Sequence, residues 1–159
     1  MSIQAAIRLR STGKFYSMDT IVVASDIASV RRDIGSLLEG PDASVIYANS
    51  GRNVLEIVKE SEVDLVIADM QIGSMGGVAV CLEMRLQASL DVIDEIPVLL
   101  VLDRRPDVFQ AKRSGADGWI VKPLDPLRIR AAAKALLNDG RYEDNSYEPV
   151  PTLVADHHS

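Results

Sequence analysis

The stretch DLVIADMQIGSMGG, residues 64–77, changes character at one acidic residue. Its first part is apolar and predicts a buried β-strand over residues 64–69. That strand ends on a carboxylate, Asp69, and a loop of small and flexible residues follows, with glycines at 73, 76 and 77. The question is why an apolar strand should end on a charge with such a loop directly after it.

Four further apolar runs flank this strand, and helical patterns separate them. The predicted strands are residues 20–24, 43–48, 64–69, 98–102 and 118–122. The predicted helices are residues 27–39, 51–60, 77–89, 105–115 and 125–138. The strands are continuously apolar rather than alternating, which is typical of strands buried on both faces of a parallel sheet. The alternation predicts one α/β domain over residues 19–138.

Composition sets limits on the class of protein. The chain has 159 residues, 47% of them hydrophobic, and a net charge of −6 from 23 acidic and 17 basic residues. A dedicated nucleic-acid binder would carry a basic face, so we expect no nucleic-acid partner. No apolar run approaches the roughly 18 residues of a membrane span. The single cysteine, Cys81, cannot form an internal disulfide; we interpret it as a small core residue and expect a cytoplasmic protein.

The two ends of the chain lack periodic apolar residues. We expect residues 1–18 to be a poorly ordered extension and residues 139–159 to be a mostly disordered tail. Both ends should be dispensable for folding, and we expect no output domain in the tail. The adjacent His157 and His158 fit a polar terminus better than a metal site, which needs more ligands.

Charged residues end three of the predicted strands. Strand one is followed by Ser25 and Asp26, strand three ends on Asp69, and strand five ends on Lys122. In a parallel α/β sheet, ligands bind at the carboxyl ends of the strands. Two neighbouring carboxylates repel each other and favour a cation, most simply Mg²⁺, whereas the lysine suits an anion. For Asp26 alone, a helix cap is an equally good interpretation.

The strand-terminal Asp69, the segment KRSGADGWIVKP (residues 112–123) and the spacing of Asp26, Asp69 and Lys122 resemble the receiver domain of two-component response regulators. The resemblance covers residues 19–137. It implies a (βα)5 flavodoxin-like three-layer sandwich with a parallel sheet of strand order 2-1-3-4-5. It also implies a signalling module rather than an enzyme.

The resemblance also assigns roles to the residues at the strand ends. Asp69 would be the phosphoacceptor, the nucleophile toward a kinase phosphohistidine. Lys122 would contact the phosphoryl group, and the Lys122–Pro123 peptide bond would be cis. Asp26, Asp69 and the backbone carbonyl of Gln71 would hold Mg²⁺. This answers the opening question, because the strand brings the acid to the sheet edge and the glycines let main chain approach a metal and a phosphate.

Several positions depart from the family pattern. Gly73 and Gly76 stand where the loop after the phosphoacceptor usually carries a proline and an aspartate. Ser25 stands where receivers usually carry a first acid, and Leu102 stands where a serine or threonine usually binds the phosphoryl oxygen. Leu102 and the retained aromatic Trp119 are the expected switch positions, so the coupling between hydroxyl and aromatic residue is half missing. Asp103 replaces a small residue. We interpret it either as a helix cap or partner of a neighbouring arginine, or as an acid that replaces the one lost at Ser25.

Two functions follow as hypotheses. The first is an atypical single-domain response regulator that is phosphorylated on Asp69 and signals by binding proteins. Its partners would be a sensor histidine kinase or phosphotransfer protein and a downstream protein target, with a homodimer formed through the fourth helix, fifth strand and fifth helix. The alternative is a pseudo-receiver, an interaction module without phosphotransfer. An α/β enzyme fits less well, because no glycine-rich phosphate loop follows strand one and both histidines lie in the tail.

Overall fold

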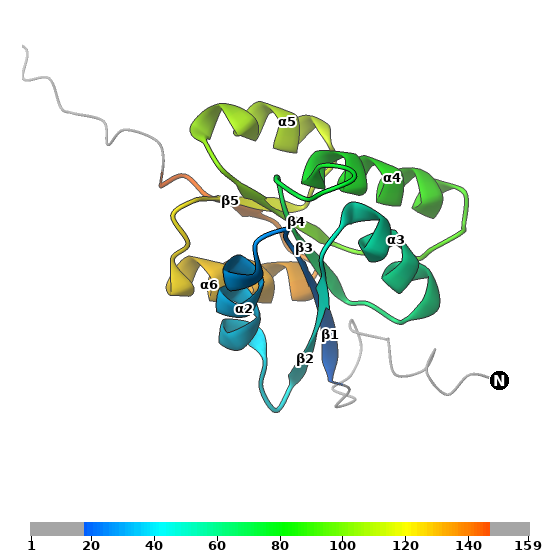
Figure 1. Ribbon diagram of the computed structural model, residues 1–159, viewed down its shortest axis with the longest axis horizontal. Coiled ribbons are helices and arrows are strands. Elements are labelled where there is room, and N and C mark those ends of the chain that lie inside the picture. Colours follow the sequence, from blue (N-terminus) through cyan, green and yellow to red (C-terminus); the bar gives the residue numbers. More distant parts are fainter. Residues whose placement is uncertain (1–17, 147–159) are drawn as a thin grey trace, which may run out of the picture.

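Strands and helices alternate along the part of the chain that the structure, a computed structural model, describes, residues 18–146 (Figure 1). The elements in order are β1 (Asp19–Ala24), α2 (Ala28–Leu38), β2 (Ala43–Ala48), α3 (Gly51–Glu60), β3 (Leu65–Asp69), α4 (Gly77–Ser89), β4 (Val98–Leu102), η1 (Arg105–Asp107), α5 (Val108–Arg113), β5 (Gly118–Val121), α6 (Pro126–Leu137) and β6 (Tyr142–Glu143). Within these residues, no helix is long and apolar enough to cross a membrane. The expected extension at residues 1–17 lies outside the described residues.

The six strands within residues 18–146 run parallel in one sheet of order β2-β1-β3-β4-β5-β6. This confirms the flavodoxin-like α/β fold and the predicted order 2-1-3-4-5, with one additional strand. Helices α2 and α6 cover one face of the sheet, and α3, α4 and α5 cover the other (Figure 1). The carboxyl ends of β1, β3, β4 and β5 therefore meet at one edge, where the candidate site lies.

The apolar runs form strands because both faces of the sheet are buried. Along β3, Val66 and Ala68 pack into the core under α3, α4 and α5, whereas Leu65 and Ile67 pack into the core under α2 and α6. The same alternation holds in β4, whose five residues are all buried. Successive side chains of a strand point to opposite faces, so a strand covered on both sides must be apolar at every position.

The carboxyl-terminal helix begins at the residue that the sequence predicted. The Asp125 side chain accepts hydrogen bonds from the backbone N–H groups of Leu127 at 2.8 Å and Arg128 at 3.3 Å, and Pro126 occupies the first helical position. Both features favour a helix start. This cap fixes the first turn of α6 and so the place of Arg128.

The prediction of a mostly disordered tail beyond residue 138 is wrong for residues 139–146. Tyr142 and Glu143 form β6 against Gly118 and Trp119, and the side chain of Asp144 is buried. One Asp144 oxygen, Oδ2, accepts hydrogen bonds from the Val121 backbone N–H and from Arg128 Nη1, both at 3.0 Å. Buried, charge-assisted contacts order this segment despite its lack of apolar period. The rest of the expected tail, residues 147–159, lies outside the described residues.

Candidate functional site

Asp69, at the end of β3, is the centre of the site. Its side chain is 1% exposed, yet its carboxylate has several donors. Ser25 Oγ donates to Oδ2 at 2.9 Å, the Gln71 backbone N–H donates to Oδ1 at 3.2 Å, and Lys122 Nζ lies 3.1 Å from both oxygens. These contacts compensate the cost of burying a charge. The structure thus brings together Asp69 and Lys122, as the sequence predicted.

Ser25 binds Asp69 directly, although it lacks the acidic group that receivers usually carry at this position. The residue is fully buried, and its hydroxyl donates to Asp69 while it accepts the Ile27 backbone N–H at 3.1 Å. The adjacent Ser25 carbonyl accepts a hydrogen bond from Arg31 Nη1, which comes from α2. An acid at position 25 could not donate to a second carboxylate. The family pattern marks Ser25 only as the loss of an acid, and no sequence motif points to Arg31.

Asp26 is exposed and links two loops of the site, because its Oδ1 accepts the backbone N–H of Gly73. Residues 18–146 contain no cluster of three or more His, Cys, Asp and Glu side chains that could hold a metal. Mg²⁺ usually keeps several waters and needs only one or two protein carboxylates, so the donor set of Asp26, Asp69 and a main-chain carbonyl at Gln71 fits this ion.

Gly77, the first residue of α4, has a steric role at the same edge. A Cβ atom at this position would lie 2.5 Å from the Asp69 carbonyl oxygen. Such a distance is far below van der Waals contact, so a larger residue would push α4 away from the end of β3. This glycine therefore makes room for the main chain of Asp69 itself.

Lys122 joins Asp69 to a second carboxylate. Its Nζ lies 2.8 Å from Asp103 Oδ1, which makes Asp103 a partner of Lys122. The next two helices begin after Arg104 and Asp107, so the interpretation of Asp103 as a helix cap is wrong. Burial lowers the pKa of Lys122, but hydrogen bonds to Asp103 and Asp69 outweigh it and raise the pKa above its usual value. Lys122 is therefore a firmly protonated bridge between two acids. The Lys122–Pro123 bond is cis, as expected.

The two expected switch positions lie in the core. Leu102, the last residue of β4, is fully buried, and Trp119 on β5 is 1% exposed. Both belong to the cluster under α3, α4 and α5, and Lys112 Nζ lies 5.8 Å from the centroid of the Trp119 ring. The end of β4 therefore presents a packed alkyl group in place of a hydroxyl. Trp119 faces this helical layer, so its emission would report mainly on the packing there.

Solved structures of receiver proteins share this fold. The chemotaxis response regulator CheY4 of Vibrio cholerae superposes with a TM-score of 0.67 at 23% identity, over 76% of this chain and 99% of that chain. The receiver domain of a signal transduction histidine kinase from Syntrophus aciditrophicus gives a TM-score of 0.67 at 23% identity, over 86% of this chain and 98% of that chain. At this level of identity, the likeness supports the fold alone.

Sequence similarity adds the family. The protein named "Probable transcriptional regulator ycf27" from Porphyridium aerugineum is 31% identical over 119 residues, which cover 75% of this chain and 48% of the relative. The DNA-binding response regulator MtrA of Mycobacterium tuberculosis is 30% identical over 144 residues, covering 87% of this chain and 59% of the relative. The chain thus spans about half the length of these curated relatives. Residues 21–134 match the family described as the response regulator receiver domain, and the chain belongs to this family.

Proposed function

We propose that this receiver domain accepts a phosphoryl group on Asp69 and signals by binding other proteins. The observation that carries the proposal is the contact of Lys122 Nζ with both oxygens of the Asp69 carboxylate, at 3.1 Å each. An ammonium group in this place can neutralise a phosphoryl oxygen once the carboxylate becomes an acyl phosphate. We propose a sensor histidine kinase or a phosphotransfer protein as the donor.

The proposed step is a displacement at phosphorus. An Asp69 oxygen attacks the phosphoryl group of a phosphohistidine, the P–N bond breaks as the new O–P bond forms, and the imidazole leaves with a proton. Lys122 then shifts from a carboxylate oxygen toward a phosphoryl oxygen. Ser25 holds Oδ2 at 2.9 Å, and we propose that Oδ1, whose backbone donor Gln71 lies farther away at 3.2 Å, is the oxygen that attacks.

We propose that Asp26, Asp69 and the backbone carbonyl of Gln71 hold Mg²⁺ during this reaction. The ion would offset the negative charge that the phosphoryl group brings next to two carboxylates. Its binding should be weak, since Ser25 contributes a hydroxyl in place of an anionic ligand. The additional interpretation of Asp103, as the acid that replaces the one lost at Ser25, stays a prediction.

A second function, that of a pseudo-receiver, is favoured by one specific observation. Lys122 is already shared by Asp69 and by Asp103, which lies closer at 2.8 Å. A phosphoryl group must therefore compete with Asp103 for the ammonium, and Leu102 offers no hydroxyl to help hold it. In this alternative the domain binds its partners without phosphotransfer.

Intact-mass spectrometry after incubation with acetyl phosphate and Mg²⁺ separates the two functions. We expect the wild type to gain the mass of one phosphoryl group and Asp69→Asn to gain none. Asp26→Asn should slow the gain, because the proposed ion loses a ligand. A wild type that never gains mass under these conditions supports the pseudo-receiver, and a gain that persists in Asp69→Asn contradicts the assignment of the acceptor.

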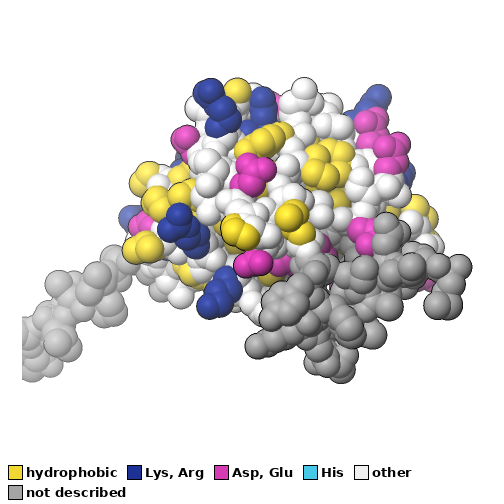
Figure 2. All heavy atoms as spheres, turned by 90° about the horizontal axis from the view of Figure 1, so that it is seen from below, with side chains coloured by type: hydrophobic (Ala, Val, Ile, Leu, Met, Phe, Trp, Pro, Cys, Tyr) yellow, Lys and Arg dark blue, Asp and Glu magenta, His cyan; other side chains and the backbone are white. Residues whose placement is uncertain are grey.

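We further propose that output runs through the face formed by α5, β5 and α6, as a contact with a downstream protein or a homodimer. Two of the most exposed apolar side chains in residues 18–146 lie there, Phe109 on α5 at 77% and Leu127 on α6 at 75%. We propose no nucleic-acid contact by this domain and a cytoplasmic location. On the face seen in Figure 2, basic side chains are interspersed with acidic and apolar ones and form no continuous basic surface.

A further inference from the structure

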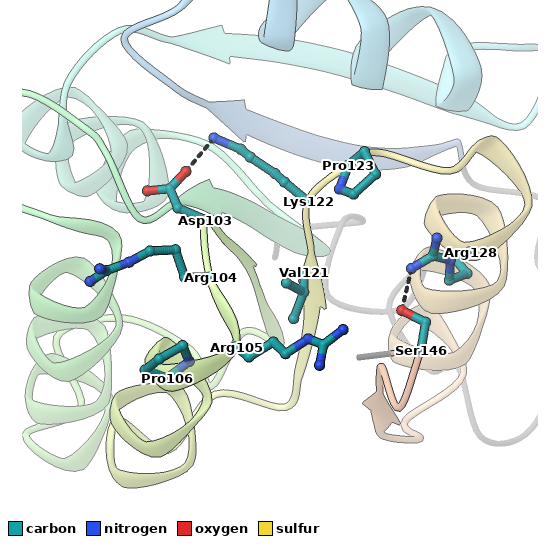
Figure 3. A pocket seen from close by; sticks show the side chains of 9 residues that line it. All are labelled: Asp103, Arg104, Arg105, Pro106, Val121, Lys122, Pro123, Arg128 and Ser146. Carbon is teal, nitrogen blue, oxygen red and sulfur yellow. Dashed lines mark hydrogen bonds and ion pairs between the residues drawn. The ribbon is translucent and has the colours of Figure 1, made fainter. Parts of the chain in front are cut away.

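A pocket of about 530 Å³ lies beside the phosphoacceptor site, between the loops that follow β4 and β5. Its lining residues are Asp103, Arg104, Arg105, Pro106, Val121, Lys122, Pro123, Arg128 and Ser146 (Figure 3). Four of the nine are cationic and one is acidic, in a chain with a net charge of −6. Three of these cations, Lys122, Arg128 and Arg104, lie near carboxylates, so Arg105 is the main source of unbalanced positive charge in the pocket.

Two guanidinium groups from different elements face this space. Figure 3 shows Arg105 of η1 extending toward Arg128 of α6 and Ser146. Within the described residues, the Arg105 guanidinium makes no ion pair or hydrogen bond. Like charges that share a pocket repel each other, so a bound anion would lower the electrostatic energy of Arg105 more than that of the other lining cations, which already have acidic partners.

The second guanidinium is held in place by internal contacts. Arg128 Nη1 lies 3.0 Å from Oδ2 of the buried Asp144 and 2.6 Å from Ser146 Oγ. Arg128 Nε lies 3.6 Å from Asp125 Oδ2. These contacts fix the fork, so little side-chain entropy is lost when the remaining N–H groups bind a ligand. One wall of the pocket is thus preorganised, and the other carries Arg105, which has no partner among residues 18–146.

We propose that this pocket binds the phosphate group of a small phosphorylated molecule, such as an organic phosphate or diphosphate. Guanidinium groups suit phosphate oxygens: Arg105 can bind them with two parallel hydrogen bonds, and Arg128 can add a donor from Nη2, the nitrogen that its contacts within the described residues leave open. The volume lies within the range of about 300–1,000 Å³ that is usual for small-molecule sites. Lys122 lines both sites, but its ammonium is taken by Asp103 and Asp69, so the arginines carry the binding.

Calorimetric titration of the full chain with inorganic pyrophosphate tests this site. The buffer contains EDTA and no Mg²⁺ and has constant ionic strength, so that phosphorylation plays no part in the result. Arg105→Gln should weaken binding about tenfold, the loss expected for a charge-assisted hydrogen bond. Arg113→Gln removes the same charge from an exposed position on α5 outside the pocket and should leave the affinity within about twofold.

Asp26→Asn separates this site from the phosphoacceptor site, because it removes an acid there without touching Lys122, which lines the pocket. The variant should bind pyrophosphate like the wild type, whereas a gain in affinity would put the anion at the phosphoacceptor site and overturn the proposal. Equal losses in Arg105→Gln and Arg113→Gln would also overturn it, because they would indicate general charge attraction. The absence of any heat of binding up to about 10 mM pyrophosphate would overturn the proposal as well. Circular dichroism verifies that each variant is folded.

Discussion

The two halves of the sheet treat the strand ends differently. In the half made of β2, β1 and β3, Ser25 donates to the candidate acceptor Asp69, and Asp26 accepts the backbone N–H of Gly73 in the loop that follows β3. In the half made of β4, β5 and β6, the end of β4 carries the alkyl side chain of Leu102 and the carboxylate of Asp103, which binds Lys122. The strand β6 lies beside β5 in this half. The comparison teaches that a receiver can keep the carboxylate expected to accept a phosphoryl group while an alkyl group replaces the hydroxyl expected to sense it.

The largest effect is expected at Leu102, the point where the second half departs most. Leu102→Thr should cost about 3 kcal/mol of unfolding free energy, because it empties space in the core. Leu100→Thr, on the same strand and in the same cluster, should cost a similar amount. Only Leu102→Thr adds a hydroxyl at the strand end, so it alone should enlarge the change in partner binding or dimerisation that acetyl phosphate induces. Urea denaturation and size-exclusion chromatography measure the two effects, and equal responses to phosphodonor in both variants would refute the role of Leu102.

The next effect tests whether β6 belongs to the second half. Asp144→Ala should lower the unfolding free energy by about 2 kcal/mol, since it leaves the Val121 N–H and Arg128 without their acceptor. Glu143→Ala, at the exposed position next to Asp144 in the sequence, should change stability by less than about 0.5 kcal/mol. Chemical denaturation compares them. If both variants unfold like the wild type, the carboxyl-terminal segment is dispensable, as the sequence suggested.

A smaller effect is expected in the first half, at Ser25. Ser25→Asp puts a second carboxylate beside Asp69 and removes a donor, so it should cost about 1–2 kcal/mol without Mg²⁺. Mg²⁺ should restore that stability and bind about tenfold more tightly than to the wild type. Ser25→Ala loses the same hydrogen bond without adding charge and should show no such rescue. Thermal melts and calorimetry at several Mg²⁺ concentrations measure the stability and the affinity. If Mg²⁺ neither changes the stability of Ser25→Asp nor produces a heat of binding, the result argues against a metal at this edge.

The smallest effect is a pH dependence of the β6 contact. Burial raises the pKa of Asp144, but hydrogen bonds from Ser146 and Val121 and the charge of Arg128 outweigh it and lower the pKa. The folded state thus holds the proton less tightly than the unfolded one, and stability from Asp144 is complete above the unfolded pKa of about 3.9. It is lost as the pH falls through the lower folded-state pKa. The stability gap between the wild type and Asp144→Asn should therefore narrow only in strong acid, and a gap that closes near neutral pH would contradict this.

Local patterns explain why the strands and helices could be predicted. Continuous apolar runs specify strands buried on both faces, and the pair Asp125–Pro126 specifies the start of a helix whichever partners surround it. The ion pair between Asp103 and Lys122 could also have been predicted from the order of the strands. Leu102 and Val121 are register partners in neighbouring strands, so the residue after each must lie at the same edge.

Two features could not be predicted, because they depend on distant partners. A two-residue strand such as β6 has no period to detect, and the burial of Asp144 depends on Val121 and Arg128, which lie 23 and 16 positions away. Ser25 was misjudged for another reason. A family pattern records which residue is missing, whereas the hydroxyl does something that an acid cannot, since it donates to Asp69.

Gly118 decides what kind of partner can reach the β5 border of the sheet. A Cβ atom there would lie 2.6 Å from the Tyr142 carbonyl oxygen, so only glycine lets the chain's own last strand lie so close. Further along β5, Asp144 takes up the Val121 N–H, and its own N–H donates to the Trp119 carbonyl. Polar backbone groups that a foreign strand would need are therefore in use. A partner cannot add a strand here by β-augmentation without first displacing residues 142–144, and it must otherwise recognise side chains.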